Sequence, residues 1–231
     1  MQFLNTKTFE RPDETRRRML RLAALGSVFA APSGVFAEEL VRTVAQTEGP
    51  FFPDRLPLDT DNDLIVINDS LDPAVGEITW LSGRVLDASG APLRNVLVEI
   101  WQCDANGAYL HSRSGNAENR DANFQGYGRF VTGLKGEYGF RTIKPVPYPG
   151  RTPHIHFKLT RGSEHLLTTQ CYINGHKQNG RDGIYQRLPN DGRRASVTVD
   201  FVPVDGSRIG ELAAAFDIVV GLTPDDEARS G

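Results

Sequence analysis

The stretch that decides the fold most clearly is PHIHFKL, residues 153–159. Successive side chains of an extended strand point to opposite faces, so Ile155, Phe157 and Leu159 would form one apolar face. His154 and His156 would share the opposite face. The alternation predicts a β-strand with one face packed in a core and the other free to bind.

Similar strand-like segments recur along the chain between turns that are rich in Gly, Asp, Asn or Pro. Short strands at this spacing predict an all-β fold, a β-sandwich of mostly antiparallel strands whose long loops carry the functional site. The sequence shows no long amphipathic helix or internal repeat that competes with this interpretation. The segments cover residues 78–86, 96–103, 129–132, 138–143, 154–160, 166–173, 196–202 and 216–222.

The first part of the chain differs in character from the rest. The basic stretch TRRRMLR, residues 15–21, precedes an apolar run over residues 22–36. This pattern resembles a twin-arginine export signal, and the run is too short to span a bilayer comfortably, which predicts cleavage rather than a stable membrane anchor. A retained basic amphipathic helix is the alternative. We expect a signal peptide at residues 1–37, one domain at 38–231, and a periplasmic or secreted protein.

Composition limits the possible partners. The 231 residues are 39% hydrophobic and 24% charged, which is ordinary for a globular domain, and the formal net charge is −3. A mildly acidic chain without a basic stripe argues against a nucleic-acid partner. Cys103 and Cys171 both lie in strand-like runs, where they could form a disulfide in an oxidising compartment or remain separate buried thiols.

The two histidines suggest a metal. Imidazoles two residues apart on a strand can bind one first-row transition ion, although such a pair can also be a hydrogen-bonded surface feature. A hard ion such as Fe(III) would also accept phenolate oxygen, even though a free phenol ionises only near pH ~10. Tyrosines elsewhere in the chain are therefore candidate ligands.

Residues 46–222 contain several motifs whose order is more specific than any one of them. They are TEGPFF at 47–52, LSGRV at 81–85, VEIWQCD at 98–104 leading to GAY at 107–109, GYGRF at 126–130, YGFRT at 138–142, and the segment 148–156. Together they resemble the intradiol ring-cleavage dioxygenases, the family of protocatechuate 3,4-dioxygenase and catechol 1,2-dioxygenase.

The resemblance implies a mononuclear Fe(III) site on a β-sandwich. Its ligands would be Tyr109, Tyr148, His154 and His156, together with a solvent hydroxide. Two phenolates and a hydroxide would balance the charge of Fe(III), and neutral imidazoles would complete the shell. Tyr109 and Tyr148 could otherwise be ordinary packing aromatics.

The resemblance also implies the reaction. A catechol-type substrate would displace Tyr148, and O2 would open the ring to a cis,cis-muconate-type diacid. Arg151 matches an arginine that stabilises negative charge on the ring, and Gln170 matches a glutamine beside the substrate; a surface ion pair and a strand amide are their alternatives. The connection from Tyr148 to His154 is shorter than in the better-known members, so the particular catechol and any oligomer stay open.

Two other functions compete. A cupin-like Fe(II) enzyme would need a nearby carboxylate, and Glu164, eight residues after His156, is placed too late for it. Residues 83–96 resemble the opening hairpin of transthyretin-like and carboxypeptidase-regulatory-like modules, which are exported binding domains without catalysis.

Overall fold

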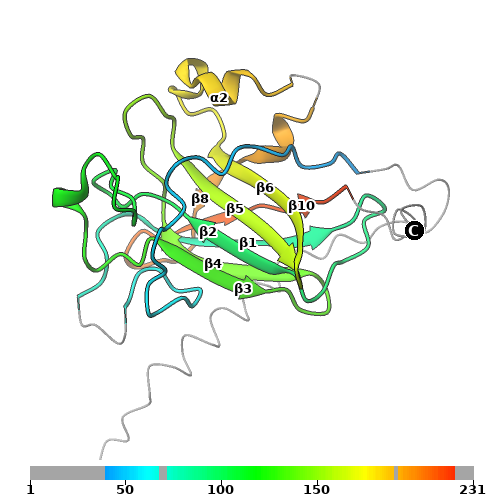
Figure 1. Ribbon diagram of the computed structural model, residues 1–231, viewed down its shortest axis with the longest axis horizontal. Helices are drawn as coiled ribbons and strands as arrows, with labels where there is room; N and C mark the ends of the chain where they lie inside the picture. The colour runs from blue at the N-terminus through cyan, green and yellow to red at the C-terminus, as the bar shows by residue number, and fades with distance from the viewer. Residues whose placement is uncertain (1–39, 68–71, 190–191, 222–231) are drawn as a thin grey trace, which may run out of the picture.

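Two stacked β-sheets form the body of the protein, and long loops extend from their ends (Figure 1). The computed structural model describes residues 40–67, 72–189 and 192–221. The predicted all-β sandwich is confirmed. The expected signal peptide at residues 1–37 lies outside the described residues.

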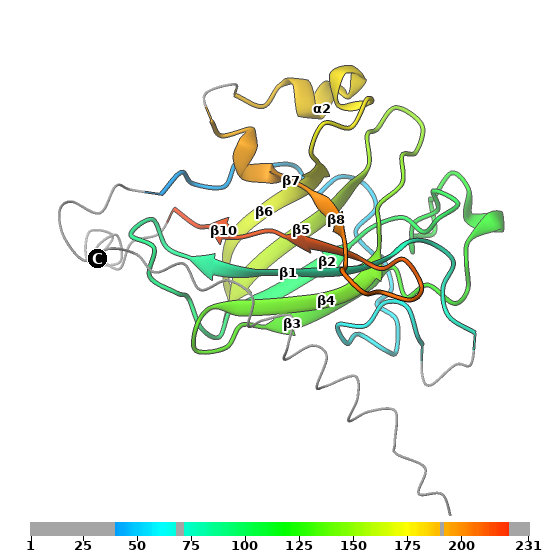
Figure 2. The same cartoon turned by 180° about the vertical axis from the view of Figure 1, so that it is seen from behind.

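The first sheet is built around β1 (Ile78–Leu86), seen at its centre in Figure 2. On one side β1 pairs antiparallel with β4 (Glu137–Ile143). On the other side it pairs in parallel with β9 (Leu212–Ala215) and β10 (Ile218–Val219), and β8 (Phe201–Pro203) pairs antiparallel with β9.

The single strand predicted over residues 216–222 is not present in the structure. The chain instead forms β9, which ends just before this range, and β10 within it, with a break between the two strands. A side chain at Gly83 would overlap the carbonyl oxygen of Phe216, so only glycine permits this close approach. At the break the Asp217 carboxylate accepts the hydrogen bond of Arg84 N at 2.8 Å. Because this pairing is irregular, the residues of β9 lack the apolar–polar alternation that would predict a strand.

The second sheet has the order β3-β2-β5-β6-β7. Its strands are β3 (Tyr127–Val131), β2 (Leu97–Trp101), β5 (His154–Arg161), β6 (Glu164–Ile173) and β7 (Thr198–Val199). The first four pair antiparallel, whereas β7 joins β6 in parallel. The four longer strands agree with the predicted segments to within a few residues.

The segment predicted as one strand over residues 196–202 is divided. It contains the end of the 3-10 helix η3 (Ala195–Val197), then β7, then the start of β8. Because β7 belongs to the second sheet and β8 to the first, the chain changes sheets here and cannot continue as one straight strand. The other described helices are η1 (Ala117–Asn119), η2 (Asn179–Arg181) and α2 (Gly183–Gln186); no described helix is long and apolar enough to cross a membrane.

The sandwich core fills the space between the sheets. Ile155, Phe157 and Leu159 from β5 are fully buried there, which confirms the apolar face expected for this strand. Burial of each such side chain contributes about 1.5–3 kcal/mol. Cys171 lies in this core, whereas Cys103 lies elsewhere, and both are buried free thiols.

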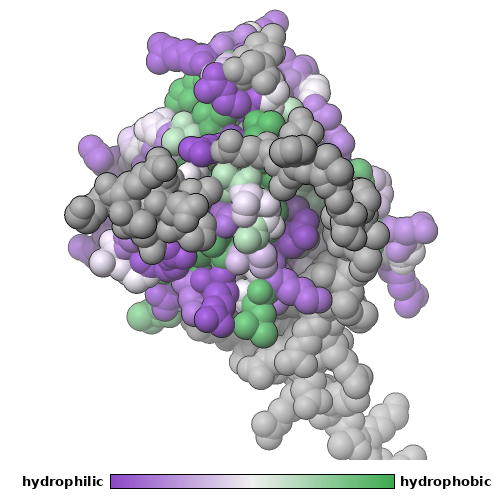
Figure 3. Space-filling model, turned by 90° about the vertical axis from the view of Figure 1, so that its right-hand side faces the viewer, coloured by the Kyte–Doolittle hydropathy of each residue, from purple (hydrophilic) through white to green (hydrophobic). Residues whose placement is uncertain are grey.

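A second group of buried side chains, the aromatic cluster, lies apart from this core. It consists of Trp101, Cys103, Tyr109 and Tyr127, with Phe51, Phe52, Leu110, Val146 and Tyr148 packed against them. On the face shown in Figure 3, hydrophilic and apolar residues are interspersed, and scattered exposed apolar residues of this kind are ordinary. The aromatic cluster therefore packs separately from the sandwich core.

Candidate metal centre

The register of the second sheet brings β5 histidines next to aromatic residues. Trp101 on β2 lies opposite His156, and His156 lies opposite Gln170 on β6. The Trp101 and His156 rings stack with centroids 4.7 Å apart and planes 7° apart. This stacking holds one face of the His156 imidazole.

The two imidazoles point toward each other, with His154 Nε2 and His156 Nε2 3.1 Å apart. His154 Nδ1 lies 2.7 Å from the carbonyl oxygen of Thr152, and because a carbonyl only accepts, Nδ1 carries the proton and Nε2 keeps its lone pair. Burial, followed by the nearby Arg151 guanidinium, lowers the pKa of His154 to about 3. Burial, followed by His154 and Arg151, also lowers the pKa of His156. Both rings are neutral at neutral pH, the form that binds metals.

Tyr109 reaches the same point from the loop after β2. The Asp104 carboxylate shapes the turn before it by accepting Asn106 N and Ala108 N, each at 2.9 Å, and Gly107 adopts a φ of 79°. The Tyr109 hydroxyl lies 3.4 Å from His154 Nε2. Phe51 stacks on the Tyr109 ring at 5.0 Å between centroids, so the phenol is held inside the aromatic cluster.

Tyr148 begins a tight turn that ends at Arg151, whose N donates to Tyr148 O at 2.9 Å. Gly150 in this turn has a φ of 81°, which favours glycine. The Tyr148 ring meets the Tyr109 ring edge-on, with centroids 5.4 Å apart. It contacts the His154 ring at a tilt, with centroids 5.6 Å apart. Tyr109, His154 and His156 are buried, whereas Tyr148 is half-buried, which makes it the donor that a molecule from solvent would meet first.

The phenols would not ionise here without a cation. Burial, and then the neighbouring groups Cys103 and Tyr148, raise the pKa of Tyr109. Burial likewise raises the pKa of Tyr148, although Arg151 partly opposes it. A bound cation reverses this balance, because it stabilises the phenolate directly. Two neutral imidazoles and two phenols around one point thus form a donor set that fits a hard trivalent ion.

Arg151 and Gln170 lie beside these donors. Arg151 Nη1 donates to the Tyr148 hydroxyl at 3.3 Å, and Nη2 donates to Gln170 Oε1 at 2.5 Å. The Gln170 amide is oriented by Nε2 donating to Thr47 O at 3.0 Å and by the Tyr172 hydroxyl donating to Oε1 at 2.9 Å. The structure therefore brings together all six residues predicted from the sequence.

Two residues at this site were not predicted as site residues. Trp101 appeared only within a motif, and its stacking on His156 depends on the register between β2 and β5. Asp182 contacts Arg151, with Nε to Oδ2 at 2.8 Å, from a distant part of the chain. A carboxylate before a four-residue helix carries little signal in a sequence.

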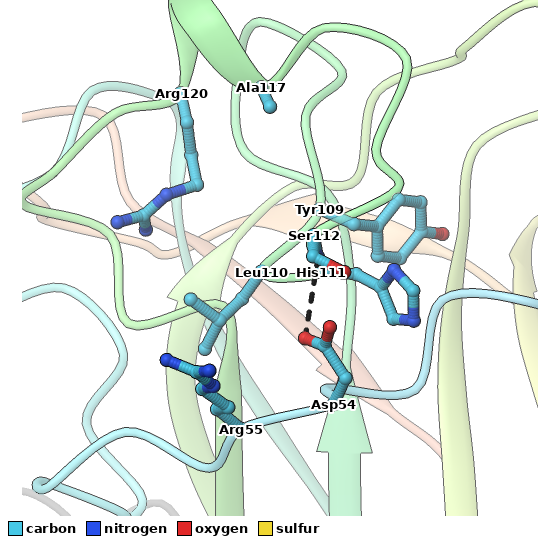
Figure 4. A pocket seen from close by; sticks show the side chains of 8 residues that line it. All are labelled: Asp54, Arg55, Tyr109, Leu110, His111, Ser112, Ala117 and Arg120. Carbon is cyan, nitrogen blue, oxygen red and sulfur yellow. Dashed lines mark hydrogen bonds between the residues drawn. The ribbon is translucent and has the colours of Figure 1, made fainter.

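Two cavities of about 390 Å³ lie next to the tyrosines. The first borders the Tyr109 ring, whose hydroxyl points away from Asp54 and Arg55 (Figure 4). The second lies against Tyr148 and Arg151 and is also lined by Pro147, Pro149, Gly150, Thr152, Gln178, Arg181 and Asp182.

The carboxylate that a cupin-like site would require is remote. Glu164 pairs with Arg161 at the far end of the β5–β6 hairpin, whereas His154 pairs with Tyr172 at the other end. Over residues 40–67, 72–189 and 192–221 there is no group of three or more His, Cys, Asp and Glu side chains that could hold a metal. The tyrosines are what complete the donor set.

Comparisons with known proteins show the family to which the chain belongs. The family model described as "Dioxygenase" matches residues 47–220. The chain is 41% identical to the protocatechuate 3,4-dioxygenase beta chain of Burkholderia cepacia, over 63% of this chain and 65% of that protein. It is 32% identical to the protocatechuate 3,4-dioxygenase alpha chain of Pseudomonas putida, over 78% of this chain and 92% of that protein.

A solved structure is similar as well. The dioxygenase domain of a dioxygenase carbohydrate-binding protein fusion from Streptomyces sp. SirexAA-E has a TM-score of 0.59 and 29% identity, covering 79% of this chain and 99% of that domain. The chain spans about half to two thirds of the length of several curated relatives that it matches. With the family match over residues 47–220, this chain belongs to the intradiol ring-cleavage dioxygenases.

Proposed function

We propose that the protein binds Fe(III) through Tyr109, Tyr148, His154 and His156 and cleaves a catechol-type ring with O2. The product would be a cis,cis-muconate-type diacid, opened between the two hydroxyl-bearing carbons. The observation that carries this proposal is a pair of neutral imidazoles, with Nε2 atoms 3.1 Å apart, that the Tyr109 hydroxyl approaches to 3.4 Å. The Tyr148 ring packs against the Tyr109 and His154 rings beside them.

The protein's own groups prepare the ligands. Thr152 O fixes the tautomer of His154, and Trp101 fixes the plane of His156. Such supporting contacts orient ligands, and their loss commonly lowers metal affinity or activity about 10- to 100-fold. When bound, Fe(III) would supply the Lewis acidity that ionises the catechol and the redox chemistry that lets O2 react with the ring.

Tyr148 is suited to exchange with the substrate. It is the partly exposed donor, and its oxygen already accepts a hydrogen bond from Arg151 Nη1 at 3.3 Å. When a catechol takes its place, the Tyr148 phenolate can accept a proton from a catechol hydroxyl. The raised pKa of this half-buried phenol favours that transfer.

Arg151 provides fixed positive charge beside the reacting ring. Its side chain is only 13% exposed, and its two Nη atoms are directed at Tyr148 and Gln170. A preorganised charge in a water-poor site stabilises negative charge that develops on the substrate, and such terms are often the largest in catalysis. Phe51, Trp101 and the rest of the aromatic cluster limit the water at this point.

Product analysis tests the function. The iron-loaded protein is incubated with catechol, protocatechuate and hydroxyquinol while O2 uptake is followed and the products are identified by mass spectrometry. We expect a muconate-type diacid that contains both atoms of ¹⁸O2 from at least one substrate. A Tyr127→Phe variant, which removes a phenol outside the donor set, should retain activity, whereas Tyr109→Phe should not. A semialdehyde product, or none with all three compounds, would contradict the proposal.

We also propose that residues 1–37 direct export to the periplasm or beyond. The support is the sequence pattern of residues 15–36 alone. A reporter fused to residues 1–37 should reach the periplasm. The double substitution Arg16→Lys and Arg17→Lys should keep the same reporter in the cytoplasm. Cytoplasmic retention of the unaltered fusion would overturn this assignment.

A further inference from the structure

Asp182 occupies an unusual position between two parts of the structure. It follows η2 and is the N-cap of α2, and its side chain is fully buried. Its Oδ1 accepts hydrogen bonds from Ile184 N at 2.8 Å and Tyr185 N at 2.9 Å. These bonds satisfy donors that a helix start leaves unpaired, which accounts for one of its two oxygens.

The other oxygen serves the candidate metal centre. Asp182 Oδ2 accepts hydrogen bonds from Thr152 N and from Arg151 Nε, each at 2.8 Å. The second is a charge-assisted bond, a class roughly twice as strong as neutral hydrogen bonds. Burial would raise the pKa of Asp182, but bonds from Tyr185 N, Thr152 N and Arg151 outweigh it and lower the pKa, so the group is a carboxylate at neutral pH.

The Arg151 guanidinium is consequently held on three edges. Asp182 holds Nε, Gln170 holds Nη2 at 2.5 Å, and Nη1 points to the Tyr148 hydroxyl at 3.3 Å. The Tyr148 and Gln170 contacts lie on the side of the proposed iron, whereas Asp182 approaches from the α2 segment. Without a partner at Nε, the guanidinium could rotate about its long side chain.

We infer that Asp182 is a positioning residue, which couples the start of α2 to Arg151 and aims the guanidinium at Tyr148 and Gln170. This role rests on the function proposed above. All four partners of the carboxylate are donors, so an amide, which has one acceptor oxygen and one NH2 group, cannot satisfy both sides. Asp182→Asn must either uncap α2 or release Arg151 and Thr152.

Serine separates the two tasks of this residue. A serine hydroxyl is a good N-cap but is too short to reach Arg151 as the carboxylate does. Asp182→Ser therefore keeps the cap and removes the contact to Arg151. A matched control is Asp63→Asn, because Asp63 is also buried, accepts a backbone bond from Ile65 N at 3.0 Å and pairs with Arg141 at 3.2 Å, away from the donor set.

The test is a double-mutant cycle on the iron-loaded enzyme. Asp182→Asn and Asp182→Ser are made in the wild type and in an Arg151→Met background, and kcat, KM and the visible spectrum of the anaerobic catechol complex are measured. We expect both variants to keep their iron and to lower kcat about 10- to 100-fold, with a smaller change in KM. In the Arg151→Met background they should change kcat by less than about twofold, because residues that act through one another are not additive.

The outcomes separate the two proposals. If the wild type is active and Asp182→Ser matches Asp63→Asn, or if the losses are equal in both backgrounds, Asp182 does not act through Arg151. If Asp182→Asn fails to fold, Asp182→Ser alone decides, since it retains the cap. A wild type that cleaves no catechol removes the proposed function and this role together.

Discussion

The sandwich core and the aromatic cluster are both buried, but they bury different chemistry. Between the sheets, Ile155 and Phe157 bury carbon atoms that need no partner. On the other face of the second sheet, the polar atoms Trp101 Nε1 on β2 and His156 Nδ1 on β5 are buried without a hydrogen-bond partner in the described part of the chain. Such groups cost free energy, of order 1–3 kcal/mol each. Burial stabilises the protein on one face of β5, whereas on the other it sets protonation states for chemistry.

The largest expected effect comes from removing a ligand on the cluster side. His156→Ala should lose its iron and its ring-cleavage activity down to the level of a buffer control, while the metal-free fold survives, because the residue contributes a ligand and little core packing. Iron analysis and circular dichroism measure the two properties separately. An iron-loaded, active His156→Ala protein would show that the donor set is misassigned.

The neighbouring residue should behave in the opposite way. Phe157→Ala leaves a cavity in the sandwich core, and such changes cost about 3–5 kcal/mol of unfolding free energy. Those molecules that remain folded should still bind iron, since the opposite face of β5 is unchanged. Urea denaturation measures the loss; a cost below about 1 kcal/mol would mean that β5 does not bury this face as described.

A milder change tests Tyr148, the partly exposed donor. Tyr148→Phe should keep part of its iron through the other three ligands, change colour and bind catechols differently. We expect kcat to fall about 100-fold, a typical contribution of a group that transfers a proton. Tyr127→Phe serves as the matched control, because its phenol bonds Glu99 instead. A spectrum identical to that of the wild type would remove Tyr148 from the ligands.

The most gradual expected effect is a pH dependence of stability in the metal-free protein. The pKa of His154 falls from 6.5 to about 3 in the folded state. Between pH 6.5 and about 3, the unfolded chain therefore binds a proton at this residue that the folded protein does not bind. Stability from this group is thus fully present above pH 6.5 and is lost as pH falls toward 3, by at most about 1.4 kcal/mol per pH unit. His154→Asn should flatten this slope in urea titrations, whereas Phe157→Leu should not; equal slopes for wild type and His154→Asn would contradict the burial argument.

Much of the fold was predictable because alternation is a local signal. The strand containing His154 and the core face containing Phe157 follow directly from residue order. Short strands that depend on distant partners were missed, as in β9, whose irregular junction with β10 reflects the close contact of Gly83 with Phe216.

The candidate site divides in the same way. Tyr109, Tyr148, His154 and His156 were predicted because the motifs that contain them resemble a family. Asp182 was not, since its role comes from contacts 30 and 31 residues away, with Thr152 and Arg151. Residues that act through a tertiary contact carry no pattern of their own.

The most direct test of the central claim is the visible spectrum of the purified, iron-loaded protein, recorded before and after anaerobic addition of catechol. Tyrosinate ligands predict a red protein with a charge-transfer band that shifts when the catechol displaces Tyr148. A colourless iron-bound protein, or a band that ignores catechol, protocatechuate and hydroxyquinol alike, would contradict a ferric site built from Tyr109, Tyr148, His154 and His156.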